Sequence, residues 1–282
     1  MSSSTLKIAA VQFPLTGDIV HNLRRMEFWI EKASRSGAEL VHFSEAALTG
    51  YYSIHLQDVK EIDRSLLEQA NGRLRELAGK WKVWLVYGST HFTGCSDKPF
   101  NSLYLVNPRG GEACRYDKIF LTNTDMEFYA PGNHLVTARI KDFKAGLTIC
   151  FDMRFPELFR RYKEAGVNLI LISSYQAKGE RAIDMKTVAP ANLITRAAEN
   201  GINLSASNTS ESPSWHESMI IRFNGRVLAK ARRHRASMAL AILDARDFEP
   251  FTSFIRRTAE YSVKAVHPML NTPLAEEIIE VP

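Results

Sequence analysis

The N-terminal half of the chain alternates short apolar runs with longer segments in which apolar side chains recur at helical spacing. Residues 6–13 form a short apolar run that favours a strand, and residues 18–38 then carry apolar side chains along one helix face. The order repeats with a strand-like run over 39–45 and a helical segment over 64–80. Three further runs of strand character follow, over residues 82–92, 101–108 and 110–120.

The C-terminal half continues the alternation and ends in hairpins. Apolar runs ending at Cys150 predict strands, and residues 155–166 then predict a helix with Pro156 in its first turn and Gly166 after its end. A buried strand over 167–173 precedes a long helical segment over 181–200. The remaining runs predict mostly antiparallel strands around the strong hairpin signal Asn224-Gly225, over residues 201–208, 217–223, 226–231 and 237–245.

Strands that alternate with helices, together with several antiparallel hairpins, predict an α/β protein with mixed sheets. No linker-like or low-complexity segment divides the chain, so residues 1–282 are interpreted as one domain. A tail from about residue 251 mixes charged and apolar residues, and the core of a monomer has little obvious use for it.

Composition and charge narrow the class of protein. Hydrophobic residues at 45%, charged residues at 24% and a formal net charge of +5 are ordinary for a folded, soluble chain of 282 residues. The densest basic cluster, residues 232–235, has no interleaved aromatic residues, so a solvated hairpin end or a subunit contact is preferred to nucleic-acid binding.

The cysteines and the apolar runs bear on the compartment. Three widely spaced cysteines predict neither a disulfide framework nor a zinc motif: Cys95, Cys114 and Cys150. The first residues do not resemble a secretory signal, and no apolar run reaches membrane-spanning length. A cytoplasmic location without membrane contact is therefore expected.

Three reactive residues each stand at the carboxyl end of an apolar run. Glu45 closes ELVHFSE, Lys118 closes CRYDK, and Cys150 closes AGLTIC. The carboxyl ends of strands in an α/β sheet gather at one edge, where sites form. Each residue alone has an ordinary structural explanation, a solvated charge or a core thiol, but together they supply complementary chemistry.

The chemistry expected of the three is nucleophilic catalysis. Lys118 and the helix that begins near Pro156 are expected to lower the pKa of the Cys150 thiol and favour its thiolate. Glu45 can accept the thiol proton, return it to a departing amine and then activate water. Lys118 would also stabilise the oxygen that becomes negative on attack at a carbonyl or nitrile carbon, together with the backbone N–H of Phe151.

Three motifs in this order resemble those of the nitrilase superfamily, the carbon-nitrogen hydrolases. They are FSEAALTGYY, YDKIFL followed by EFYAPG, and ICFDMRFPELFR, and the similarity extends over nearly the whole chain through VQFP and ITRAAENG. The resemblance implies Cys150 as nucleophile, Glu45 as general base and Lys118 as the residue that stabilises the tetrahedral intermediate. It also implies that Glu127, in EFYAPG, positions the substrate and the lysine.

Three further residues are expected to border the substrate: Tyr51 in the glutamate motif, Phe151 beside the nucleophile, and Tyr175 in the segment SSYQAKGE. This segment also brings Gln176 to the pocket lining. The turn PSWHESMIIRFNG departs from the small-residue turn usual in the family, with Trp215, His216 and Glu217 within it. A relative's substrate therefore does not transfer directly to this chain.

The resemblance implies a four-layer α-β-β-α sandwich of two mixed sheets with helices outside. It implies a homodimer or larger assembly in which the tail from about residue 251 packs on a neighbouring subunit. The implied reaction is hydrolysis of a small linear amide or an N-carbamoyl amine through a cysteine thioester, without a metal or organic cofactor. Two alternatives stay open: a nitrilase acting on a carbon-nitrogen triple bond, and a catalytically silent scaffold of the same fold.

Overall fold

The computed structural model describes residues 4–94, 98–177, 182–247 and 278–281. Its first sheet has six strands in the order β12-β1-β2-β3-β4-β5. The pairs β1–β2 and β2–β3 are parallel and the other pairs are antiparallel, so the sheet is mixed. In chain order these strands are β1 (Thr5–Gln12), β2 (Leu40–His42), β3 (Trp84–His91), β4 (Phe100–Val106), β5 (Glu112–Asp117) and β12 (Ser237–Asp244).

The second sheet has seven strands in the order β11-β10-β9-β8-β7-β6-β13. Its centre, β7-β8-β9, is parallel, because α4 (Pro156–Glu164) and α5 (Ala182–Asn200) supply the crossovers between these strands. The strands are β6 (Leu135–Ile140), β7 (Phe143–Ile149), β8 (Leu169–Ser173), β9 (Asn203–Ser207), β10 (Met219–Ile221), β11 (Val227–Lys230) and β13 (Ile278–Val281).

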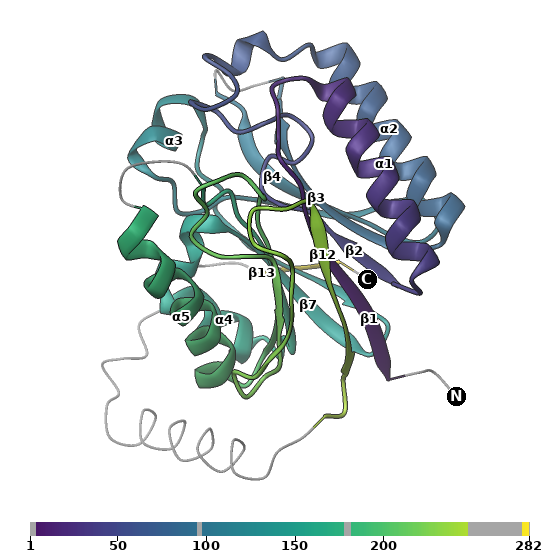
Figure 1. Cartoon of the computed structure of the whole chain (residues 1–282), viewed down its shortest axis with the longest axis vertical. Helices are drawn as coiled ribbons and strands as arrows, with labels where there is room; N and C mark the ends of the chain where they lie inside the picture. Colours follow the sequence, from purple (N-terminus) through teal and green to yellow (C-terminus); the bar gives the residue numbers. More distant parts are fainter. Residues whose placement is uncertain (1–3, 95–97, 178–181, 248–277, 282) are drawn as a thin grey trace.

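Helices cover the outer faces of both sheets. Figure 1 shows α1 (Ile19–Arg35) and α2 (Arg64–Trp81) on one side of the molecule and α4 and α5 on the other, with the sheets between them. One buried cluster joins α1 and α2 to the first sheet, and another joins α4 and α5 to the second. The predicted four-layer α-β-β-α sandwich is confirmed.

A third apolar cluster fills the space between the sheets, and a buried histidine crosses it. His42, at the end of β2, has Nε2 2.9 Å from Ser173 Oγ and Nδ1 2.9 Å from Ser205 Oγ, both in the second sheet. Ser173 Oγ already donates to the Phe43 carbonyl, so it accepts from Nε2–H, and Nδ1 accepts from Ser205. Burial lowers the pKa of His42 to about 3, so the imidazole that links the sheets is neutral.

Short helices and turns complete the described chain. They are η1 (Val59–Glu61), α3 (Asn123–Phe128) and η2 (Cys150–Arg154). Residues 232–235 lie in the connection between β11 and β12, where Arg233 pairs with Glu217. No helix among the described residues is long and apolar enough to cross a bilayer.

Most of the tail from about residue 251 lies outside the described residues. Its final segment, β13, pairs in parallel with β6 and extends the chain's own second sheet. This short part of the tail therefore pairs with the chain's own second sheet, and the packing of the tail on a neighbouring subunit stays a prediction.

Candidate active site

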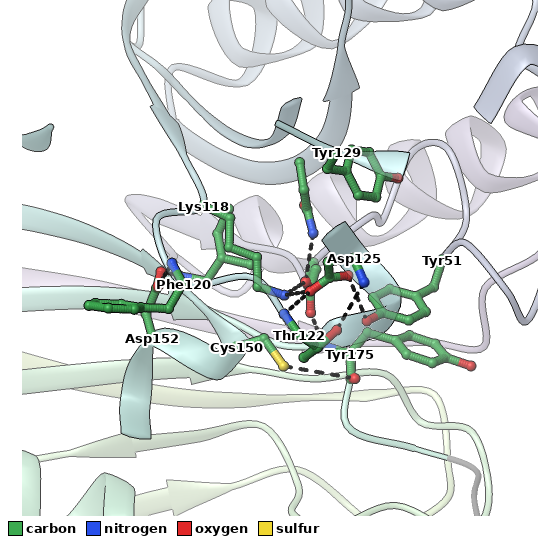
Figure 2. A network of polar contacts seen from close by, with 12 residues as sticks. Tyr51, Lys118, Phe120, Thr122, Asp125, Tyr129, Cys150, Asp152 and Tyr175 are labelled. Carbon is green, nitrogen blue, oxygen red and sulfur yellow. Dashed lines mark hydrogen bonds and ion pairs between the residues drawn. The ribbon is translucent and has the colours of Figure 1, made fainter. Parts of the chain in front are cut away.

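Three strand ends bring the reactive residues to one place between the sheets. Glu45 follows β2 and Lys118 follows β5 in the first sheet, whereas Cys150 follows β7 in the second. The side chains of Glu45 and Lys118 are fully buried and Cys150 is 7% exposed. Figure 2 shows Lys118 and Cys150 facing the same small space, together with Asp125 and Tyr175.

Both oxygens of the Glu45 carboxylate are occupied. Oε1 accepts hydrogen bonds from Lys118 Nζ and from Asn101 Nδ2, each at 2.8 Å. Oε2 accepts from the backbone N–H of Tyr175 at 2.7 Å. Asn101, in β4, is a site residue that the sequence reasoning missed. These three donors fix the carboxylate in one orientation, as a general base requires.

The position of Glu45 depends on a glycine in the adjacent strand. A Cβ on Gly88 would lie 2.3 Å from the backbone nitrogen of Ala46 and 2.7 Å from the carbonyl carbon of Glu45. Such distances are far inside van der Waals contact. Only glycine therefore allows β3 to pass this close to the segment that carries the carboxylate.

Lys118 lies between two carboxylates. Its Nζ is 2.8 Å from Glu45 Oε1 and 2.8 Å from Asp125 Oδ2, and Asp125 is 1% exposed. Burial works to lower the pKa of Lys118, but the neighbouring carboxylates outweigh it and hold the pKa well above its ordinary value. The ammonium is thus permanently charged, and Lys118 lowers the pKa of Asp125 against the effect of burial.

The second carboxylate of the site is Asp125, and the expected role of Glu127 is corrected. Glu127 is exposed on α3, whereas Asp125 contacts Lys118 and accepts from Tyr51 Oη at 3.2 Å. A capping box between Thr122 and Asp125 starts a short helix there. This helix turns Asp125 inward and residue 127 outward. The pattern T-x-x-D at residues 122–125 is the feature of the sequence from which this helix start could have been predicted.

Cys150 occupies a strained position at the end of its strand. Its φ is +46°, in the left-handed region that residues with a Cβ seldom adopt, and η2 begins at the cysteine itself. A nucleophile on such a sharp strand-to-helix turn projects away from the sheet into the space next to it. The strain is the local consequence of presenting the thiol between the sheets.

The resting thiol is protonated, contrary to the expectation of a thiolate. Burial raises the pKa of Cys150, and the neighbouring Glu45 carboxylate raises it further, while Lys118 lowers it only in part. The helix α4 begins at Pro156, beyond η2, and is not adjacent to the thiol. The expected depression of the thiol pKa was therefore wrong, and proton transfer to Glu45 must accompany attack.

Asp152 ties the cysteine turn to the segment that carries Lys118. Its Oδ2 accepts from Tyr116 Oη and from the backbone N–H of Ile149, each at 2.8 Å, and its Oδ1 accepts from Phe120 N at 3.0 Å. Burial raises the pKa of this carboxyl to about 6 against the effect of these donors. These contacts fix the position of the nucleophile, in the second sheet, relative to the segment that carries Lys118, in the first sheet.

Tyr51 and Tyr175 form an aromatic wall beside the charged groups. Their rings stack with centroids 4.4 Å apart and an interplanar angle of 10°. Tyr175 Oη donates to the buried Glu211 at 3.1 Å, and the carboxylate also contacts His55 Nε2 at 3.1 Å. His55 Nδ1 accepts from Tyr51 N, so the wall is fixed at both ends.

Phe151 and Gln176 are neighbours of Cys150, and Trp215 contacts Gln176. Phe151 follows Cys150 in η2, where the first backbone N–H groups of a helix have no partner within it, and its ring packs on the edge of Phe155. Gln176 Nε2 lies 3.7 Å from Cys150 Sγ. Trp215, in the turn that departs from the family pattern, donates its backbone N–H to Gln176 O at 2.9 Å. Across the described part of the chain, no group of three His, Cys, Asp or Glu residues could hold a metal ion.

Comparison with known proteins places this arrangement in a family. The family described as carbon-nitrogen hydrolase matches residues 7–251. The 2-oxoglutaramate amidase of Bacillus subtilis (strain 168) is 30% identical over 233 residues, which cover 80% of this chain and 86% of the relative.

Solved structures of an amidase from Nesterenkonia sp. AN1 share the fold. Its active-site cysteine mutant in complex with butyramide aligns with a TM-score of 0.76 and 22% identity, covering 93% of this chain and 97% of that one. A second mutant of that enzyme, with the acetamide moiety of fluoroacetamide bonded to its active-site cysteine, aligns with a TM-score of 0.77 and 22% identity, covering 94% and 98%. Together with the Glu45, Lys118 and Cys150 cluster, the family match and the Bacillus subtilis relative show that the chain belongs to the carbon-nitrogen hydrolase family, in the amidase-like branch of the nitrilase superfamily.

Proposed function

We propose that the chain hydrolyses the carbon-nitrogen bond of a small amide or N-carbamoyl amine through a thioester on Cys150. The observation that carries this proposal is the buried cluster of Cys150, Glu45 and Lys118, in which Glu45 Oε1 lies 2.8 Å from Lys118 Nζ and the carboxylate and the ammonium both act on the pKa of the thiol. It contains a nucleophile, a base and a fixed cation, which are the groups that acyl transfer requires.

The first half of the reaction forms the acyl-enzyme. Glu45 takes the thiol proton as Sγ bonds to the carbonyl carbon, and the carbonyl oxygen becomes negative. Lys118 donates to that oxygen, and the backbone N–H of Phe151 is the second expected donor. Glu45 then protonates the leaving nitrogen, the carbon-nitrogen bond breaks, and ammonia or an amine departs.

The second half hydrolyses the thioester. Glu45, again a carboxylate, removes a proton from water as the water oxygen attacks the acyl carbon. The carbon-sulfur bond breaks, Sγ recovers a proton from Glu45, and the carboxylic acid leaves. The high pKa of the thiol suits this cycle, because the neutral thiol is the resting form between turnovers.

The test compares two buried cysteines. Cys150→Ala should lower kcat/KM for ammonia release from small amides by at least about 10⁴-fold, because it removes the nucleophile that forms the acyl-enzyme. Cys114→Ala is the matched control, since Cys114 is also a buried free thiol but lies within β5, where burial and Glu112 raise its pKa. Full amidase activity in Cys150→Ala would overturn the proposal.

Covalent labelling separates an active enzyme from a silent scaffold of the same fold. Fluoroacetamide, which forms an adduct with the active-site cysteine of the Nesterenkonia enzyme, should label one thiol, mapped by mass spectrometry to Cys150. Nitriles assayed beside amides address the other alternative, and faster ammonia release from nitriles would favour a nitrilase. We also propose a cytoplasmic homo-oligomer, which light scattering and fractionation can check.

A further inference from the structure

Gln176 presents an unused hydrogen-bond acceptor beside the proposed nucleophile. The residue is 4% exposed, and its Nε2 lies 3.7 Å from Cys150 Sγ and 3.7 Å from Met153 Sδ. The other end of the carboxamide, Oε1, is buried and has no hydrogen-bond partner within the described part of the chain. The mechanism above gives this oxygen no role.

The backbone N–H and the backbone carbonyl of Gln176 both form hydrogen bonds, and these fix the point from which its side chain extends towards Cys150. Its N–H donates to Asn208 Oδ1 at 2.8 Å, and its carbonyl accepts from Asn208 Nδ2 at 3.3 Å and from Trp215 N at 2.9 Å. The unusual turn that contains Trp215 therefore supports the position of Gln176.

A buried amide oxygen without a donor is unfavourable, and native proteins keep few such atoms. The carboxamide oxygen and nitrogen are bonded to the same carbon, so Oε1 belongs to the planar group whose nitrogen contacts Sγ. A donor that arrives with the substrate would satisfy it. This oxygen is thus expected to face an atom bonded directly to the carbon that Cys150 attacks.

Two of the atoms bonded to that carbon already have protein partners in the proposed mechanism. The carbonyl oxygen turns to Lys118 and the leaving nitrogen to Glu45, which leaves the first atom of the acyl group. We propose that Gln176 determines specificity by accepting a hydrogen bond from an N–H at this acyl-side position. The inference rests on the proposed function and narrows its substrate class to N-carbamoyl amines, in which the acyl-side neighbour is an N–H.

The reaction balances with the groups already described. Attack at the ureido carbon releases the terminal nitrogen as ammonia, protonated by Glu45, and leaves R–NH–CO–S on Cys150. Water then replaces sulfur, Sγ recovers its proton, and the carbamate product decomposes to carbon dioxide and the amine. The acyl-side N–H stays bonded throughout both steps, so Gln176 can hold it in each.

The test uses two substrates of the same shape. Propylurea and pentanamide differ only in an N–H or a CH₂ next to the scissile carbonyl. Gln176→Met keeps the length of the side chain but removes the acceptor, and should lower the ratio of kcat/KM for propylurea over pentanamide by about 10- to 100-fold relative to the wild type. The exposed Gln69→Met is the matched control and should leave the ratio unchanged.

Other outcomes separate this inference from the proposed function. An unchanged ratio in Gln176→Met, with both substrates turned over, overturns the role of Gln176 alone. Absence of turnover of either substrate, together with no labelling of Cys150 by fluoroacetamide, overturns the proposed function and this inference with it. Should Gln176→Met not fold, binding to Cys150→Ala decides: propylurea should bind at least about 10-fold more tightly than pentanamide, and equal affinities refute the inference.

Discussion

Asp125→Asn and Glu127→Gln form a matched pair on one short helix. The two carboxylates are two residues apart on α3, but Asp125 is buried against Lys118 and Glu127 is exposed. Each substitution removes one negative charge with little change in shape. The pair therefore tests directly which carboxylate positions the lysine.

The geometry sets the size of the effect. At 2.8 Å the attraction between Lys118 Nζ and Asp125 Oδ2 is about 6 kcal/mol for an effective dielectric constant of about 20. Loss of one partner of a buried pair typically costs about 3–5 kcal/mol. Lys118 keeps Glu45, and an asparagine oxygen still accepts, so we expect Asp125→Asn to lower the free energy of unfolding by about 2–3 kcal/mol.

Activity should respond more sharply than stability. A lysine held from one side only donates less well to the developing oxyanion, and kcat/KM should fall by about 10²- to 10³-fold. Glu127→Gln should change the free energy of unfolding by less than about 0.5 kcal/mol, as is usual at the surface, and should leave kcat/KM unchanged.

Urea denaturation followed by tryptophan fluorescence measures the first quantity, and ammonia release from a small amide measures the second. A larger loss of activity in Glu127→Gln than in Asp125→Asn would refute the assignment. So would an Asp125→Asn enzyme with the stability and kcat/KM of the wild type.

Three further predictions follow from contacts around the site. Gly88→Ala should displace the backbone at Glu45 and lower kcat/KM by at least about 10-fold, and wild-type kinetics in this variant would count against the close approach. The pKa of His42 is about 3 in the folded chain and 6.5 for the free side chain, so the folded state loses stability as pH falls from about 6.5 towards 3. Between pH 7 and pH 5, the free energy of unfolding measured by chemical denaturation should fall by about 2 kcal/mol more in the wild type than in His42→Gln. Parallel pH profiles of the two proteins would disprove this. Tyr51→Phe removes the hydrogen bond to Asp125 and should lower the free energy of unfolding by about 1 kcal/mol. In a double-mutant cycle, the effects of Tyr51→Phe and Asp125→Asn on the free energy of unfolding should not add, because both act on the same hydrogen bond.

Much of the fold followed from the sequence because its strands are short, apolar and bounded by turn residues. The alternation of strands and helices predicted a mixed α/β protein. The strand ends at Glu45, Lys118 and Cys150 predicted that the three side chains meet, but the structure brings them together from two facing sheets and not at the edge of one sheet. The two-sheet layering came from the family resemblance, since periodicity does not show how sheets stack.

The parts of the site that the sequence did not predict depend on packing. A helical turn over residues 123–128, too short for a periodic signal, decides that Asp125 faces inward and Glu127 outward. The pKa of Cys150 depends on the depth of its burial and on the distance to Glu45, which only the folded chain defines. Asn101 belongs to an ordinary strand, and nothing in its sequence context marks it as a partner of Glu45.

Because Cys150 has a left-handed φ, the stability of the fold and the catalytic activity favour different residues at this position. Glycine adopts this conformation without the steric conflict that a Cβ introduces, so Cys150→Gly should unfold at a higher temperature than Cys150→Ala, although both lack the thiol. Selection for a stable fold alone would therefore favour replacement of the cysteine at this position. In descendants of this chain, a glycine here would mark a lineage that has abandoned the reaction, and a cysteine kept in spite of the strain would mark one that still depends on it.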